Sequence, residues 1–134
     1  MQLKLSTDYA IRMTLYLAML GSVATAADIS TAMAIPREYI TALAKPLRRA
    51  GILCTVRGAN GGFALGRAPE QISLHEIVNL VEGTTRINRC LEDDGYCSRN
   101  GTATCPVHRF YAHIQSYLDQ AFQDKTIASL LEDA

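Results

Sequence analysis

The chain has 134 residues, of which 49% are hydrophobic, enough for one domain with a substantial core. Its apolar runs are interrupted well before the roughly 18 residues of a membrane span. Asp8 and Arg12 lie within the apolar N-terminal stretch, unlike in a secretion signal, so we expect a cytoplasmic protein. We find no P-loop, dinucleotide fingerprint or Ser/His/Asp arrangement, which argues against an enzyme.

The formal net charge is zero, but the charges are unevenly distributed along the chain. Residues 37–67 hold six basic side chains against Glu38 alone, a balance of +5. Residues 68–134 hold ten acidic against five basic side chains, a balance of −5. A basic segment of this kind in a neutral chain indicates a polyanionic partner.

The first predicted helix covers residues 6–20, with Ser6 or Thr7 as its cap and Asp8 in its first turn. Its apolar side chains form two stripes at helical spacing, one from Tyr9 to Leu20 and one from Ile11 to Ala18. A helix that is apolar on two sides is usually buried on two sides, so it predicts contacts with its own domain and with a second subunit.

Two further helices follow, over residues 25–33 and from Pro36 to about Ala50, separated by a tight turn at residues 34–35. Pro36 suits a first helical turn, Gly51 suits the stop, and Pro46 is expected to kink the second helix. The apolar side chains of that second helix recur at helical spacing and predict its buried face: Ile40, Leu43, Ala44 and Leu47.

A β-hairpin is predicted next, with strands at 53–56 and 63–65 around Asn60–Gly61. A helix then opens at Ser73, with Glu76 at capping-box spacing, and ends at Gly83. A long amphipathic helix of roughly 18 residues starts near residue 107, and a short one spans 126–131. The fold class is therefore mainly α with a small β-hairpin wing.

Two helices joined by a tight turn and followed by a hairpin are typical of a winged helix-turn-helix, whose second helix reads the major groove of DNA. Basic side chains farther along that helix would position it on phosphates. A hairpin tip rich in glycine suits a wing over a minor groove. The candidate DNA-binding residues are Arg37, Glu38, Tyr39 and Thr41 for bases, Lys45 and Arg48 for phosphates, and Arg57, Asn60, Gly61 and Gly62 in the wing.

A polar loop carries three of the four cysteines, with the spacing Cys90-x6-Cys97-x7-Cys105-x2-His108. We consider four interpretations of this loop: a zinc site, a thiol or disulfide switch, inert thiols and an iron–sulfur cluster. The loop lacks the short Cys-x(2–4)-Cys knuckle that is typical of structural zinc sites. Spacing alone nevertheless does not choose between zinc and a cluster. Cys54, in a predicted strand, is interpreted as an ordinary buried thiol.

Four features of the sequence occur together: LSTDYAIRMTLYLA, PLRRAGIL, TVRGANGGFALGRAPEQISLHEIV and the cysteine triad. They resemble the Rrf-two family of bacterial transcription regulators, of the IscR, NsrR and RirA type. The resemblance implies a homodimer, a repressor by expectation, that binds a pseudo-palindromic operator in double-stranded DNA. It also implies a long dimerisation helix, which matches the apolar stripe Val107, Phe110, Ile114, Leu118 and Ala121.

The same resemblance implies an iron–sulfur cluster held by Cys90, Cys97 and Cys105, sensing iron, redox state or nitric oxide. His108 would complete a [2Fe–2S] site, whereas Asp8 of the partner subunit would complete a [4Fe–4S] site. The ordinary alternatives to ligation are that Asp8 is a first-turn acid and that His108 caps a helix. A cluster-free regulator using a thiol/disulfide switch or a zinc site stays open as the other function.

We accordingly expect three segments. Residues 1–83 form a winged helix-turn-helix DNA-binding domain, residues 84–106 a cysteine-containing cluster loop, and residues 107–134 the dimerisation helix and a short C-terminal helix.

Overall fold

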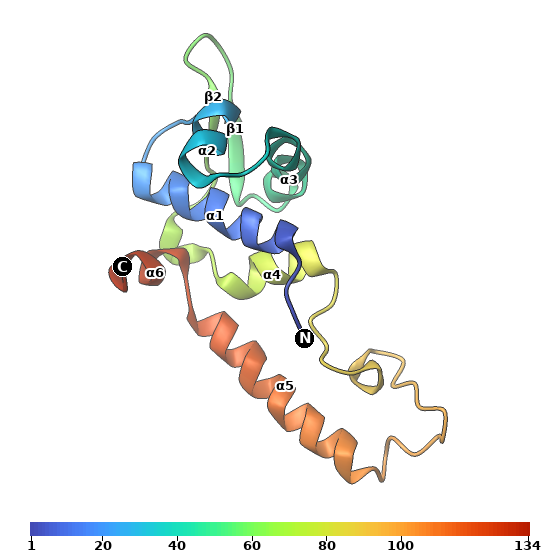
Figure 1. Ribbon diagram of the computed structural model, residues 1–134. Coiled ribbons are helices and arrows are strands. Elements are labelled where there is room, and N and C mark those ends of the chain that lie inside the picture. The colour runs from blue at the N-terminus through green and yellow to red at the C-terminus, as the bar shows by residue number, and fades with distance from the viewer.

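The computed structural model describes all residues, 1–134, and has six α-helices and one antiparallel hairpin (Figure 1). The elements are α1 (Leu5–Leu20), α2 (Ala26–Met33), α3 (Arg37–Arg49), β1 (Leu53–Val56), β2 (Gly62–Leu65), η1 (Pro69–Gln71), α4 (Leu74–Glu82), η2 (Arg89–Leu91), α5 (Pro106–Asp124) and α6 (Ile127–Glu132). This architecture confirms the predicted fold class, and no helix is both long and apolar enough to cross a bilayer.

Helix α1 is the central element of the core, with Ala10, Met13 and Leu17 almost completely buried. The predicted cap of this helix is wrong, because α1 starts at Leu5 and its N-cap, Lys4, makes no side-chain hydrogen bond. The Thr7 hydroxyl instead donates to a Glu82 carboxylate oxygen at 2.5 Å, as does the Lys4 backbone N–H at 2.7 Å. These bonds fasten the start of α1 to the end of α4.

Helices α2 and α3 form the helix-turn-helix, and the turn between them is as tight as the sequence predicts. Thr25 caps α2 through a reciprocal capping box with Asp28. Ala34 then adopts a left-handed conformation, with φ 53°, and Pro36 is the N-cap of α3 rather than part of its first turn. The buried face of α3 is the predicted one, and Pro46 lies inside the helix, which continues to Arg49.

The end of α3 is a Schellman motif. Gly51, at φ 75°, donates its N–H to the carbonyl of Arg48, and Ile52 donates to the carbonyl of Leu47. The chain then turns directly into β1, so α3 and the hairpin are joined by three residues, 50–52, whose backbone N–H groups are all hydrogen-bonded. The two strands pair from Leu53 opposite Leu65 to Val56 opposite Gly62.

The C-terminal third leaves this core and returns to it. Helix α5 extends away from the helix-turn-helix, with the cysteine loop at its far end (Figure 1). Helix α6 then docks back on the first domain, where Ile127 is completely buried in the common core. A β-bridge between Ser73 and Thr126 secures this return, so α6 packs with the residues of segment 1–83.

Candidate functional site

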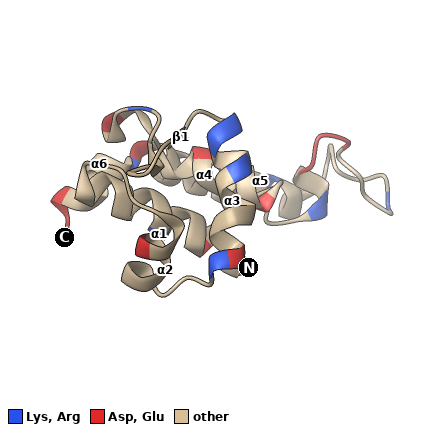
Figure 2. Cartoon of the chain, turned by 90° about the horizontal axis from the view of Figure 1, so that it is seen from above, with Lys and Arg blue, Asp and Glu red and all other residues tan.

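Helix α3 presents one polar face to solvent opposite its buried stripe. Arg37, Thr41, Lys45 and Arg48 recur every three or four residues, and all are exposed, as is Glu38. Figure 2 shows basic segments on α3 and near the hairpin, whereas an acidic segment lies on the cysteine loop. The structure thus gathers most of the sequence-predicted reading residues on one exposed helix face.

Tyr39 differs from the other predicted reading residues because its ring is half-buried. The ring packs edge-on against Tyr9 of α1, with centroids 5.0 Å apart. Arg12 lies over the Tyr9 ring, donates to the carbonyl of Met33 at 3.2 Å and pairs with Asp8 at 2.5 Å. This group of side chains seats the start of α3 on α1, and Asp8 has a structural partner within its own chain.

The wing connects the two strands through Arg57–Gly61, a five-residue loop that includes the exposed Arg57 and Asn60. Its position beside α3 is fixed by contacts at its base. Arg48 donates to the Thr55 hydroxyl at 3.3 Å, and Phe63 exchanges two backbone hydrogen bonds with Ala24, at 2.8 and 2.9 Å. The wing therefore stands on both α3 and the linker between α1 and α2.

Arg67 has a role that the sequence did not indicate. Counted there only as part of the basic segment, it donates to the carbonyls of Ala50, Gly51 and Gln71 and pairs with Glu76. It thus joins the end of α3, the base of the wing and the start of α4. Because Glu76 is engaged by Arg67, the capping box predicted with Ser73 is only half formed: Ser73 accepts from the Glu76 N–H.

The cysteine loop encloses a second candidate site. A pocket of about 290 Å³ is lined by all three predicted ligand cysteines and by His108. Arg89, Tyr96 and Tyr111 contribute to the same walls. The three thiols are half-buried and none is in a disulfide. Side chains from the loop and from the start of α5 therefore line one pocket.

Two of these candidate metal ligands, Cys90 and His108, are in contact with each other. The Cys90 sulfur lies 3.3 Å from Nδ1 of His108 and accepts a hydrogen bond from Asn88 at 3.1 Å. Cys105 is the N-cap of α5, and its sulfur accepts from the His108 N–H at 3.4 Å. The start of α5 is thus bonded to a thiol of the pocket.

Hydrogen bonds around Cys97 lower the pKa of its thiol. The backbone N–H of Gly101, and then that of Arg99, hydrogen-bond its sulfur and lower the pKa of the thiol, with smaller contributions from Thr102 and the Arg99 charge. Lowering the pKa favours the thiolate, which is the form of cysteine that binds metals and acts as a nucleophile.

No three His, Cys, Asp or Glu side chains lie close enough together to hold a single metal ion. The three cysteines and His108 instead lie around the pocket. Cys54 lies apart, in β1, where its thiol donates to the carbonyl of Leu65 at 3.6 Å. Asp8 of the same chain does not line this pocket.

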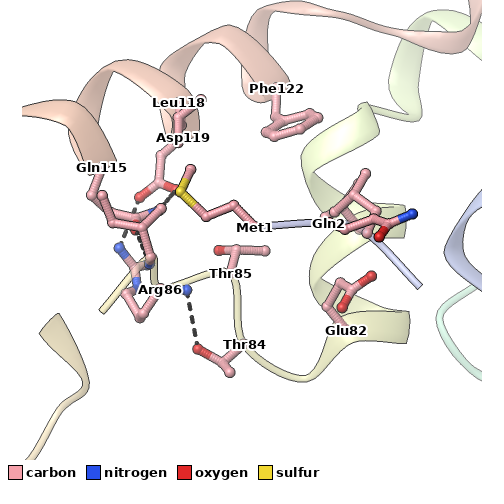
Figure 3. A pocket seen from close by; sticks show the side chains of 13 residues that line it. Met1, Gln2, Glu82, Thr84, Thr85, Arg86, Gln115, Leu118, Asp119 and Phe122 are labelled. Carbon is pink, nitrogen blue, oxygen red and sulfur yellow. Dashed lines mark hydrogen bonds and ion pairs between the residues drawn. The ribbon is translucent and has the colours of Figure 1, made fainter. Parts of the chain in front are cut away.

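A pocket of about 260 Å³ lies between the N-terminus, the end of α4 and the middle of α5 (Figure 3). Its polar groups are bonded to one another. Gln115, only 3% exposed, accepts from the Ile87 N–H at 2.8 Å and donates to Asp119, which pairs with Arg86 at 3.0 Å. These bonds hold α5 against the segment that leads into the cysteine loop.

Helix-turn-helix, wing and exposed basic face define a winged-helix DNA-binding protein. The Rrf2 (Rrf-two) family model, described as "Iron-dependent Transcriptional regulator", matches residues 3–133, so the chain belongs to the Rrf2 family. A relative, "Protein aau3" of Rhizobium meliloti (strain 1021), is 30% identical in an alignment of 125 positions, which covers 87% of this chain and 81% of that protein. Members of this family are transcriptional regulators and not enzymes.

Two solved structures share the fold over nearly the whole chain. "T. potens IscR" superposes with a TM-score of 0.79 and 20% identity, covering 99% of this chain and 88% of that one. "CymR (YrzC) the Global Cysteine Regulator of B. subtilis" gives 0.76 and 21%, covering 100% and 98%. At these identities the likeness concerns the fold, which the two regulators and this chain have in common.

Proposed function

We propose that this transcriptional regulator is a homodimer that reads a pseudo-palindromic operator and responds to iron, redox state or nitric oxide through an iron–sulfur cluster. The main observation in support is the pocket that brings Cys90, Cys97, Cys105 and His108 together. We also propose that the expected segments, 1–83, 84–106 and 107–134, correspond to DNA binding, sensing and dimerisation. We also propose that the protein acts in the cytoplasm, where it would meet DNA.

The proposed DNA contacts come from the exposed face of α3 and from the wing. Arg37, Glu38 and Thr41, near the start of α3, would face base edges in the major groove. Lys45 and Arg48 would contact phosphates, and Arg57 with Asn60 would reach toward the minor groove. Tyr39 would contribute only the exposed part of its ring, since the remainder packs on Tyr9.

Replacing Arg48 with alanine is expected to weaken binding to all duplexes by a similar factor. Loss of one phosphate contact lowers the slope of log affinity against log salt by about 1, without changing sequence preference. Fluorescence anisotropy over a salt series, with an operator selected from a random duplex library, measures both. Arg109→Ala, which removes an exposed arginine of α5, should leave the slope unchanged; an equal effect from both variants would contradict the assignment.

The proposed dimer interface is the outward face of α5. Val107, Phe110 and Tyr117 are 50%, 60% and 73% exposed and, with Ile114 and Ala121, recur at spacings of three and four. Gln115 and Asp119 on the opposite side bind the chain's own loop. Such a sustained apolar stripe on a long helix suits pairing with a second helix. Leu118, predicted for the interface, instead lines the pocket of Figure 3.

Phe110→Glu is expected to dissociate the dimer, because it places a charge in the centre of an apolar helix pair. The dissociation constant should rise roughly 30-fold or more, the effect of losing an interface anchor. Sedimentation velocity over a concentration series measures it. Ser116→Glu adds the same charge to α5 away from the stripe and should leave the dimer intact. A wild-type protein that sediments as a monomer would remove this part of the proposal.

The residues of the cysteine pocket fit an iron–sulfur cluster. Thiolates are the ligands of such clusters, three thiols line the pocket, and Cys97 is held toward the thiolate form. When bound, the cluster would supply a redox-active centre. Ligation would fix the sulfur of Cys105, which caps α5, and so the start of the proposed dimerisation helix. A group bound in the pocket would therefore influence the position of α5 and, through it, the geometry of the proposed dimer.

His108 is the fourth ligand that the contacts favour, because its ring already lies against Cys90, whereas Asp8 pairs with Arg12. His108→Ala is therefore expected to reduce cluster content, while Asp8→Ala leaves it near the wild-type level. Iron and acid-labile sulfide, assayed in both variants after anaerobic purification, distinguish the two. The reverse pattern would identify Asp8 of the partner subunit as the ligand and favour a [4Fe–4S] cluster.

The test of the cluster itself is an ultraviolet–visible spectrum of protein purified without oxygen, with iron and sulfide measured on the same sample. A brown protein with matching iron and sulfide supports the proposal. A colourless protein after attempted reconstitution contradicts it. Bound zinc would then indicate a zinc site, and metal-free protein with oxidisable thiols would indicate a disulfide switch. The DNA-binding assignment rests on other residues and is independent of this result.

A further inference from the structure

The segment between Cys90 and Cys97 is closed by a clamp made of Arg89, Asp94 and Tyr96. The Arg89 guanidinium donates two parallel hydrogen bonds to the Asp94 carboxylate, both 2.5 Å long. It also lies over the Tyr96 ring, 5.3 Å from the centroid. Asp94 in turn accepts from the Tyr96 N–H at 3.2 Å. Arg89 precedes Cys90 and Tyr96 precedes Cys97, so the clamp joins the immediate neighbours of both cysteines.

The backbone between these residues supports the closure. The Gly95 N–H donates to the carbonyl of Glu92 at 2.8 Å, which turns the chain within four residues. Gly95 has φ 56°, a conformation that suits glycine. The Thr102 hydroxyl donates to the Gly95 carbonyl at 2.9 Å and ties this turn to the second half of the loop. These hydrogen bonds give the segment between Cys90 and Cys97 a defined shape.

The clamp adds little to the stability of the fold as a whole. Arg89 and Asp94 are 54% and 60% exposed, and ion pairs in such positions contribute little to unfolding free energy. Its geometry nevertheless is specific, because a bidentate arginine–carboxylate pair fixes both partners in one plane. Arg89 and Tyr96 also line the cysteine pocket. The clamp is therefore placed to order the thiols and not to hold the domain together.

We propose that Arg89, Asp94 and Tyr96 are positioning residues that hold Cys90 and Cys97 on one wall of the pocket before a cluster binds. This inference rests on the proposed function. A loop ordered in advance loses less conformational entropy when its thiols become ligands, so the clamp would speed cluster uptake and strengthen retention. Partners outside the ligand set commonly change metal affinity by roughly 10–100-fold.

Asp94→Asn tests the clamp with little change in size, and Asp93→Asn is its matched control, since it removes the same charge one residue earlier. Two measurements are needed. Hydrogen exchange of the Gly95–Cys97 amides in reduced, cofactor-free protein reports whether the loop is closed. The rate of anaerobic cluster reconstitution, followed by absorbance, reports whether closure positions the thiols. Arg89→Lys keeps the positive charge but loses the planar fork, so it should resemble Asp94→Asn.

We expect Asp94→Asn to accelerate exchange and to slow reconstitution by about tenfold, with Asp93→Asn matching the wild type. Unchanged exchange in Asp94→Asn overturns the clamp, whatever the cluster content. Faster exchange with wild-type reconstitution overturns its positioning role. A wild-type protein that takes up no cluster instead overturns the proposed function, and the positioning role with it; that result is separate because it appears before any variant is compared.

Discussion

Protein carrying Cys97→Ala is expected to lose the proposed iron–sulfur cluster while keeping its fold and the proposed dimer. Cys97 lies on a loop outside the hydrophobic core, so removing its sulfur creates no core cavity. Hydrogen bonds from the loop backbone also lower the pKa of the Cys97 thiol, which favours the thiolate that binds metals. Iron and sulfide per monomer should fall by more than about tenfold, since even partners outside the ligand set cost that much.

Cys54→Ser is the matched control, because it removes the one cysteine outside the pocket and should leave cluster content unchanged. Circular dichroism and sedimentation of both variants verify that fold and assembly persist. A normal cluster content in Cys97→Ala would contradict the ligand assignment. Loss of the cluster in Cys54→Ser as well would indicate a general defect in the samples and not a ligand effect.

The second large effect is expected from Gly62→Ala at the base of the wing. A Cβ at this position would lie 2.3 Å from the carbonyl oxygen of Ala24 and 3.0 Å from the Thr25 nitrogen, both backbone atoms. Gly62 also has φ 156°, which side chains rarely adopt. Because the β2 strand and the α1–α2 linker are bonded through Phe63 and Ala24, neither can move aside without breaking that bridge.

We expect this substitution to lower the free energy of unfolding by about 2–4 kcal/mol, as a clash combined with backbone strain does. The Tm should fall by about 10 °C for a chain of this size, and DNA affinity should fall with it because the wing loses its support. Thermal and urea unfolding of cofactor-free protein provide the measurement. Gly101→Ala is the control, since no atom closer than 4.0 Å meets its Cβ. Equal stabilities would show that the wing base is not close-packed.

Gly62 illustrates how sequence and structure give different reasons for one residue. The hairpin motif led to the prediction that Gly61 and Gly62 contact DNA through a narrow tip. The structure shows that both are required by the chain itself, because a Cβ on Gly61 would also meet backbone, at 2.2 Å from the Val56 carbonyl oxygen. Contact with DNA at these two positions stays a prediction, and the glycines would be necessary even without it.

The sequence by itself determined the elements and the class of protein. Helical spacing predicted the buried face of α3, from Ile40 to Leu47, and glycine predicted the ends of α3 and α4. Three cysteines and a histidine on one polar loop predicted a shared ligand site; that role stays a prediction, and all four residues line one pocket. These features depend on local periodicity, turn chemistry and short loops, and such signals are contained in neighbouring residues.

Tertiary structure alone decided the contacts that join distant segments. Thr7 binds Glu82 instead of capping its helix, Arg67 links α3 to α4, and Ile127 returns to the first domain. In each case a side chain compatible with several local roles takes the partner that the folded chain brings near. Local sequence does not encode which distant carbonyl or carboxylate will be closest, because that depends on how all the helices pack together.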